Sequence, residues 1–260
     1  MDARIAELSP ATTEREIRVE LAAAYRLVDY FGWCELIYGH LTARVPGPDH
    51  HFLINPYGLN YDEVTASNLV KIDVDGNVVE DTPYPVNKAG FVIHSAIHMQ
   101  HESDNHVVMH THTRAGMAIA ALDEGLLPIS MNSTMFYGGL SYHDYEGASL
   151  YLDERERLQA SLGRNKAMIL RNHGLLTVGR TVPEAFMWLY RLERSAQVQV
   201  DAAAAGKLRL LTDNVASRSR DDVVGFIGDG TQNGSGMDFG RMEFAALMRK
   251  LDKIDRSYRD

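Results

Sequence analysis

The sequence holds one cysteine among 260 residues, Cys34, so no disulfide can form within a single chain. Disulfides persist mainly in oxidising compartments, and we therefore expect a cytoplasmic protein. No apolar run approaches the roughly 20 residues needed to span a bilayer. The N-terminal segment MDARIAELSPATTERE also lacks the apolar core of a secretory signal. We therefore expect neither a membrane partner nor export.

Positive charge is scarce as well, since 26 Lys and Arg stand against 35 Asp and Glu, a formal net charge of −9. Nucleic acids and anionic membranes bind proteins through clustered basic residues. The charge balance therefore argues against nucleic acid and leaves a small molecule as the expected partner. With 45% hydrophobic and 23% charged residues, the chain has the composition of a globular protein with a sizeable core.

The spacing of apolar residues alternates between helical and strand-like along the chain. Thr13 and Glu16 are spaced as a capping box before a first helix, and Thr181 and Glu184 repeat this signal before a helix that reaches about residue 205. Between residues 36 and 79, short apolar runs and turn residues are typical of strands. Further helices are predicted at 88–101, 114–122 and about 239–251, and strands at 106–112 and within 167–179.

Interleaved hairpins and helices of this kind predict an α/β fold, a three-layer α/β/α sandwich with a largely antiparallel central sheet. We expect one domain over residues 1–205. Residues 206–260 are expected to form an irregular segment rich in Gly and Asp and a C-terminal helix. This second part would pack on the same domain or on a neighbouring subunit.

Two histidines, His110 and His112, occupy alternate positions at the end of the predicted strand VVMHTHTRAG. Residues i and i+2 of a strand face the same side, so both rings can reach one metal ion. His173, in ILRNHGLLTVG, is the best third ligand because a turn can bring its ring to the same face. Three imidazoles suit zinc first, with manganese and iron as alternatives. The other interpretation is three unrelated histidines with ordinary hydrogen bonds in the core.

A second histidine cluster lies in HSAIHMQH, where His94, His98 and His101 share one stripe of the predicted helix. The glutamate of a helical H-E-x-x-H motif is absent, because Ser95 stands in its place. A second metal site is therefore not expected here. We expect His94 or His98 to line the cleft instead.

Several segments together resemble the class II aldolase/adducin family from the first helix to about residue 200. The resemblance rests on the segments YGHLTARVPG, FLINPYGLNYDEVTASNLVKIDVDG, HSAIH, VVMHTHTRAG and LRNHGLLTVG. It implies a class II aldolase-like fold and a homo-oligomer, often a tetramer, with the active site between subunits. It also implies one divalent metal per subunit, held by His110, His112 and His173.

The sequence departs from the family where the aldolases carry a Ser-Ser-Glu stretch whose glutamate moves protons near the metal. Lys88, Ala89 and Gly90 stand there, so the chain resembles a glutamate-lacking, adducin-like subset. Most side-chain donors for a sugar phosphate are missing too, although Lys88 could pair with one carboxylate. From the same resemblance, the expected substrate contacts are Gly39, His40, Tyr57, Gly58 and Asn87.

A metal-dependent carbon–carbon lyase of aldolase or decarboxylase type is the function that these features predict. The substrate would be a small oxo- or hydroxy-carboxylic acid that reacts through a metal-stabilised enolate. His94, His98 and Tyr142 are the candidate proton donors, with His143 beside Tyr142. Two alternatives stay open: a mononuclear iron oxygenase on the same ligands, and a non-catalytic, adducin-like interaction module.

Overall fold

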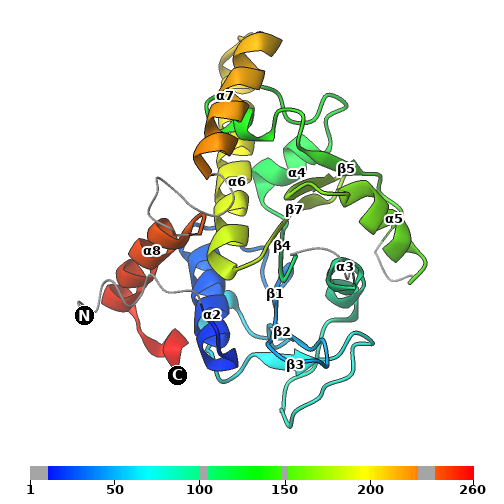
Figure 1. Ribbon diagram of the computed structural model, residues 1–260, viewed down its shortest axis with the longest axis vertical. Helices are drawn as coiled ribbons and strands as arrows, with labels where there is room; N and C mark the ends of the chain where they lie inside the picture. Colours follow the sequence, from blue (N-terminus) through cyan, green and yellow to red (C-terminus); the bar gives the residue numbers. More distant parts are fainter. Residues whose placement is uncertain (1–10, 100–104, 148–151, 228–237) are drawn as a thin grey trace.

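Seven strands form one sheet through the middle of the protein in the computed structural model, which describes residues 11–99, 105–147, 152–227 and 238–260 (Figure 1). The order across the sheet is β3-β2-β1-β4-β7-β6-β5. Neighbouring strands are antiparallel except β5 and β6, which confirms the largely antiparallel sheet. The strands are β1 His40–Arg44, β2 Phe52–Ile54, β3 Val70–Ile72, β4 Val107–Thr111, β5 Ser141–His143, β6 Ala167–Leu170 and β7 Gly174–Gly179.

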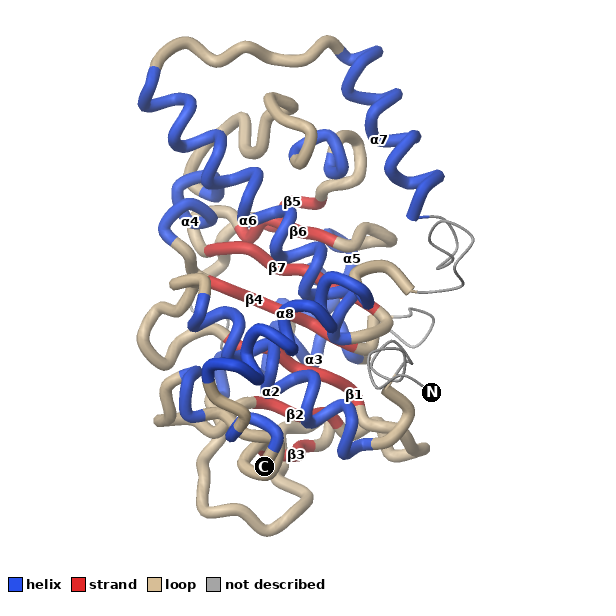
Figure 2. The backbone as a smooth tube through the Cα atoms, turned by 90° about the vertical axis from the view of Figure 1, so that its left-hand side faces the viewer, coloured by secondary structure: helices blue, strands red, loops and turns tan. Residues whose placement is uncertain are grey.

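Helices cover both faces of this sheet and complete the expected three layers. One face carries α2 Glu14–Tyr30, α4 Arg114–Ala120, α6 Val182–Ala205 and α8 Arg241–Ile254. The other face carries α3 Lys88–His98 and α5 Glu154–Leu162. Figure 2 shows α2, α6 and α8 lying across the strands from the first of these faces. In the described part of the chain, no helix is both long and apolar enough to cross a membrane.

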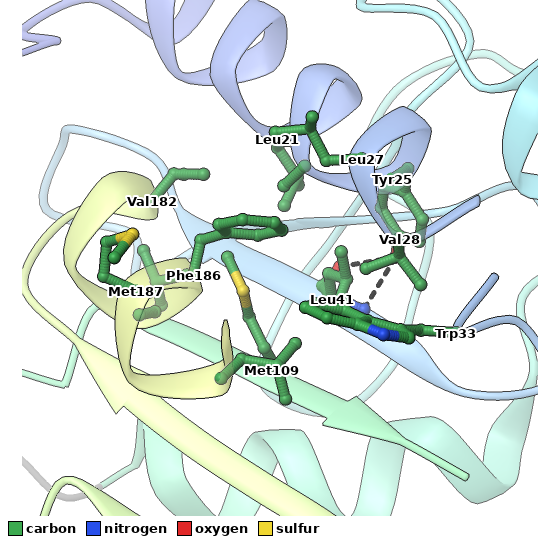
Figure 3. Close-up of a cluster of buried hydrophobic side chains, with 14 of the residues drawn as sticks. Leu21, Tyr25, Leu27, Val28, Trp33, Leu41, Met109, Val182, Phe186 and Met187 are labelled. Atoms are coloured by element: carbon green, nitrogen blue, oxygen red, sulfur yellow. Dashed lines mark hydrogen bonds between the residues drawn. The ribbon is translucent and has the colours of Figure 1, made fainter. Parts of the chain in front are cut away.

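Alternation along the central strands divides the core into two parts. Leu41 and Met109 pack with α2 and α6, in the cluster around Phe186 that Figure 3 shows. Val108 and Leu176 instead pack against α3 and α5. Because side chains two residues apart face the same side, His110 shares the α3 side with Val108. The strand pattern thus determines which helix layer covers the histidines.

The two predicted helix starts are both present, but only one has the full capping box. Thr13 and Glu16 cap each other, with the Glu16 N–H donating to Thr13 Oγ1 at 3.3 Å and the Thr13 N–H donating to Glu16 Oε2 at 3.0 Å. Thr181 Oγ1 accepts from the Glu184 N–H at 3.3 Å, as predicted. The Glu184 carboxylate, however, accepts from the Arg180 N–H at 2.8 Å.

The main error of the sequence prediction lies between residues 206 and 240, where a helix forms in the segment expected to be irregular. Helix α7 spans Asp213–Ile227 and packs on the short 3-10 helix η2, Ser133–Phe136. Ala216 is fully buried and Ser219 Oγ lies 2.8 Å from Thr134 Oγ1. The apolar stripe of α7 is narrow because its sequence is rich in Asp, Ser and Arg, so tertiary contacts stabilise a helix that periodicity did not reveal.

The C-terminal residues pack on the first helix layer of the same chain. Arg241 at the start of α8 makes a buried ion pair with Glu20 of α2. Two backbone hydrogen bonds join the end of the chain to the loop before β3. The Ala66 N–H donates to the Tyr258 carbonyl at 2.9 Å, and the Ser67 N–H donates to the Asp260 carbonyl at 2.8 Å.

The predicted helix at 88–101 ends at His98, and residues 100–104 lie outside the described part.

A buried tyrosine connects α2 to β1 and provides a test of how the helix layer is held. The Tyr25 hydroxyl donates to the Leu41 carbonyl at 2.6 Å and accepts from the Leu41 N–H at 2.8 Å (Figure 3). We predict that Tyr25→Phe lowers the free energy of unfolding by about 1–3 kcal/mol, because these buried backbone groups lose their partner. Urea denaturation measures the change. Tyr30→Phe, at a 42% exposed tyrosine of the same helix, is the control, and equal stability of the two variants would contradict the prediction.

Candidate metal centre

Three histidine rings meet at one end of the central strands. His110 lies on β4, His112 follows the last residue of that strand, and His173 lies in the turn between β6 and β7. The Nε2 atom of His110 is 2.7 Å from that of His112 and 3.2 Å from that of His173, and the remaining pair is 3.0 Å apart. All three nitrogens therefore face one point, as the sequence predicted.

The donor set fits a divalent cation. Nitrogens that bind one zinc ion at about 2.0–2.1 Å in a tetrahedral arrangement lie about 3.3 Å apart, close to the observed spacing. Hydrogen bonds cannot join all three pairs of facing nitrogens, because each such bond needs one nitrogen that carries a proton and one that does not. A cation satisfies all three lone pairs together. Within the described residues, this is the one cluster of His, Cys, Asp or Glu that could hold a metal.

The turn Asn172-His173-Gly174 directs the third ring to this point. Asn172 has a left-handed backbone with φ of 55°, which asparagine adopts more readily than most residues. Its N–H donates to the Ala120 carbonyl at 3.0 Å, and the His173 N–H donates to the Leu170 carbonyl at 3.1 Å. These bonds hold the turn between α4 and the end of β6, with His173 Nε2 close to those of His110 and His112.

Contacts at the far side of two rings set which nitrogen faces the centre. His110 Nδ1 lies 2.9 Å from the Leu175 carbonyl. That carbonyl can only accept, so Nδ1 carries the proton and Nε2 keeps its lone pair. His112 Nδ1 lies 2.7 Å from Glu35 Oε2. Sequence reasoning missed Glu35, which lies 77 positions away in a loop, and no local motif signals this contact.

Burial keeps two of the three rings neutral. Burial, followed by the neighbouring histidines, holds the pKa of His110 well below its ordinary value of 6.5. The same causes lower the pKa of His173 to about 4. Neutral imidazole is the form that binds a metal, so neither ring has to lose a proton at neutral pH before it can do so.

A cavity of about 360 Å³ opens beside the three rings. Three of the expected substrate contacts, Gly39, His40 and Asn87, line it together with Glu35 and Tyr145. Sequence reasoning also missed Tyr145, whose ring centroid is 6.1 Å from that of His173. Among the described residues, the lining does not include the other two expected contacts, Tyr57 and Gly58; the Tyr57 N–H donates to the Pro85 carbonyl at 3.0 Å.

His40 is one of the buried side chains that line the cavity. It is paired with His110 across β1 and β4, and only 5% of its surface is exposed. Burial lowers its pKa to about 3, so the ring is neutral. In the described structure its Nε2 is buried without a hydrogen-bond partner.

The candidate proton donors on α3 lie behind His40 and do not line the cavity. The Thr42 hydroxyl bridges them, 2.7 Å from His94 Nδ1 and 2.7 Å from His98 Nε2. His94 and His98 are both buried, and burial lowers the pKa of His98 to about 3. The His98 ring also stacks on Phe52 with a centroid distance of 4.7 Å. His98 thus has the contacts of a core residue, whereas His94 lies edge-on to His40, with ring centroids 5.8 Å apart.

The remaining candidates are placed elsewhere. Tyr142 packs with the α2–α6 cluster on the opposite side of the sheet; its hydroxyl accepts from the Leu126 N–H at 3.1 Å, and the Arg171 guanidinium covers its ring. Its neighbour His143 is held by Ser161 Oγ at 2.9 Å from Nδ1. Lys88 begins α3, but its side chain lies outside the described part of the structure, as does His101.

Comparison with known proteins agrees with the fold. Residues 19–200 match the class II aldolase and adducin N-terminal domain. An aldolase II superfamily protein from Pseudomonas syringae is 48% identical, with a TM-score of 0.86 over 96% of this chain and 97% of the other. An L-fuculose 1-phosphate aldolase from Glaciozyma antarctica is 30% identical, with a TM-score of 0.80 over 98% of both chains.

The chain is also similar in sequence to adducins. Alpha-adducin from Rattus norvegicus is 43% identical over 248 residues, which cover 93% of this chain but 34% of the adducin. This chain therefore spans about a third of that relative, and the rest of the adducin has no counterpart in the match. From its sequence and its fold, the chain belongs to the class II aldolase and adducin family.

Proposed function

We propose that the protein is a divalent-metal-dependent carbon–carbon lyase that acts on a small oxo- or hydroxy-carboxylic acid. The observation that carries this proposal is the convergence of three Nε2 atoms within 3.2 Å of one another beside an open cavity. Membership of the class II aldolase family supports it, as does the likeness to a solved aldolase. A divalent cation in such a site supplies Lewis-acid stabilisation of the negative charge that develops on the substrate when the carbon–carbon bond breaks.

The residues around the cavity support an unphosphorylated substrate. No Arg or Lys side chain is among the described residues that line it, and a phosphate dianion needs several convergent donors. His40 and Asn87 are placed to hydrogen-bond a polar group, whereas Tyr38, Met117 and Tyr145 offer apolar surface. A carboxylate or hydroxyl beside a small carbon skeleton suits this lining.

We further propose zinc as the first choice of metal, one per subunit, and a cytoplasmic homotetramer as the assembly. Apolar side chains around the cavity support an assembly in which another subunit covers its mouth. Leu36 is 73% exposed, Tyr145 56% and Tyr38 45%. Large exposed apolar residues grouped in this way are typical of surfaces that contact another protein.

A second candidate function is a non-catalytic interaction module, and the identity to alpha-adducin favours it. The two candidates differ in what they require of the histidines. A fold kept only for protein contacts has no need of three neutral imidazoles that face one point in a cavity. Elemental analysis after purification without chelators separates them, since the lyase needs about one metal ion per chain.

A close approach at Gly174 allows the three rings to meet. A side chain there would place its Cβ 2.4 Å from the Thr111 carbonyl oxygen, 3.2 Å from His112 Cδ2 and 3.3 Å from His110 Cε1. Contacts this short would displace β4 from the start of β7. Glycine at this position therefore follows from the geometry of the proposed metal site.

We predict that Gly174→Ala weakens zinc binding by at least tenfold, because the added methyl separates His173 from the pair on β4. Competition with a fluorescent zinc chelator measures the affinity. Gly139→Ala is the matched control, since its Cβ would meet nothing closer than Asn165 Oδ1 at 3.9 Å. Wild-type zinc affinity in Gly174→Ala would show that the rings need no such close approach.

We also predict that replacing His110 and His112 together by alanine abolishes both metal binding and metal-stimulated cleavage of the substrate acid. The loss follows because one remaining imidazole cannot hold the ion. His51→Ala, at a histidine of the loop before β2, keeps all three ligands and is the control. Full metal content or full activity in the double variant would refute the lyase proposal.

A further inference from the structure

Glu35 contacts the metal centre from a part of the chain that contributes no ligand. Its Oε2 lies 2.7 Å from His112 Nδ1, on the side of the ring away from the three facing nitrogens. Its side chain is 44% exposed and lines the same cavity. The distance is that of a short, charge-assisted hydrogen bond.

The loop that carries Glu35 is anchored at both ends. Before Glu35, Trp33 is 5% exposed and stacks on Phe31, and its N–H donates to the Val28 carbonyl at 2.9 Å. After it, the Tyr38 N–H donates to the Glu35 carbonyl at 2.9 Å, and the Tyr61 hydroxyl donates to the Tyr38 carbonyl at 3.2 Å. The carboxylate is therefore presented by a tight, fixed turn.

Leu36 shows that this turn is built at a conformational cost. Its φ is 52°, in the left-handed region that is unfavourable for leucine. The leucine side chain is 73% exposed, so its own packing does not offset this cost. The turn places Glu35 against His112 and Tyr38 at the cavity.

We infer that Glu35 is a positioning residue of the metal centre: its carboxylate accepts the Nδ1 proton of His112, which fixes the ring tautomer and leaves Nε2 free for the cation. This inference rests on the metal site of the proposed function. His110 has the same arrangement through the Leu175 carbonyl. The Glu35 carboxylate, however, adds negative charge, which makes the His112 imidazole more basic and a stronger metal ligand. His112 needs such a partner because it lies beyond the end of β4 and is more exposed than His110.

Replacing Glu35 tests this role through metal affinity rather than activity. Outer carboxylates of this kind change metal affinity by about 10–100-fold, so we expect Glu35→Ala to raise the zinc dissociation constant by that factor. Glu35→Gln keeps an oxygen that accepts the proton but loses the charge, and an intermediate increase is expected. Chelator competition on the full chain measures both, and the visible spectrum of the cobalt-loaded protein reports ligand geometry.

Glu156→Ala removes the same charge from the exposed surface of α5 and is the matched control. Unfolding temperatures of the metal-free proteins should agree, which separates a role in binding from a role in folding. Zinc bound as tightly by both Glu35 variants as by the wild type would overturn the inference while the metal site itself stands. If the wild-type chain takes up no zinc, the proposed function fails as well.

Discussion

The structure of the site depends on one constraint, the convergence of three imidazole rings from two separate strand ends. Strand alternation places His110 and His112 on one face, and the left-handed turn at Asn172 brings His173 to the same point. The absence of a side chain at Gly174 allows the turn to approach β4 closely enough for the rings to meet. Each of these features is local, but together they bring the three imidazole rings to one point at the adjoining ends of β4 and β7.

Burial supplies the electrostatic condition for this convergence. The α3 layer covers the histidine face of the sheet and excludes water, and it thereby lowers the pKa of His110, His40 and His98. Neutral rings can lie close together without repulsion, whereas three imidazolium ions could not. The Thr42 hydroxyl lies within hydrogen-bond distance of one ring nitrogen each of His94 and His98 within the core, so the second histidine cluster is held away from the cavity. The two histidine clusters thus differ in their surroundings: His110, His112 and His173 face the cavity, whereas His94 and His98 pack in the core.

Sequence reasoning reached the parts of this site that local geometry determines. The shared direction of His110 and His112 could be predicted because a period of two is a property of any strand. The approach of His173 could be predicted because a turn residue beside glycine can redirect a ring. Glu35 could not be predicted, since its contact depends on the fold of a distant loop and on a strained leucine. Helix α7 was missed for a related reason: it is stabilised by packing on η2, and its few apolar residues do not reveal this packing in the sequence. Tyr142 was predicted as a proton donor from its residue type. The alternation along β5 instead directs its side chain to the α2–α6 face, away from the histidines.

X-ray absorption at the zinc edge of the metal-loaded protein tests the central claim most directly. We expect three imidazole nitrogens at about 2.0–2.1 Å, with any further ligand an oxygen donor at the open side. Replacing His173 by alanine should lower the imidazole count from three to two. A spectrum with sulfur from Cys34 in the inner shell, or one with a single imidazole, would contradict the account.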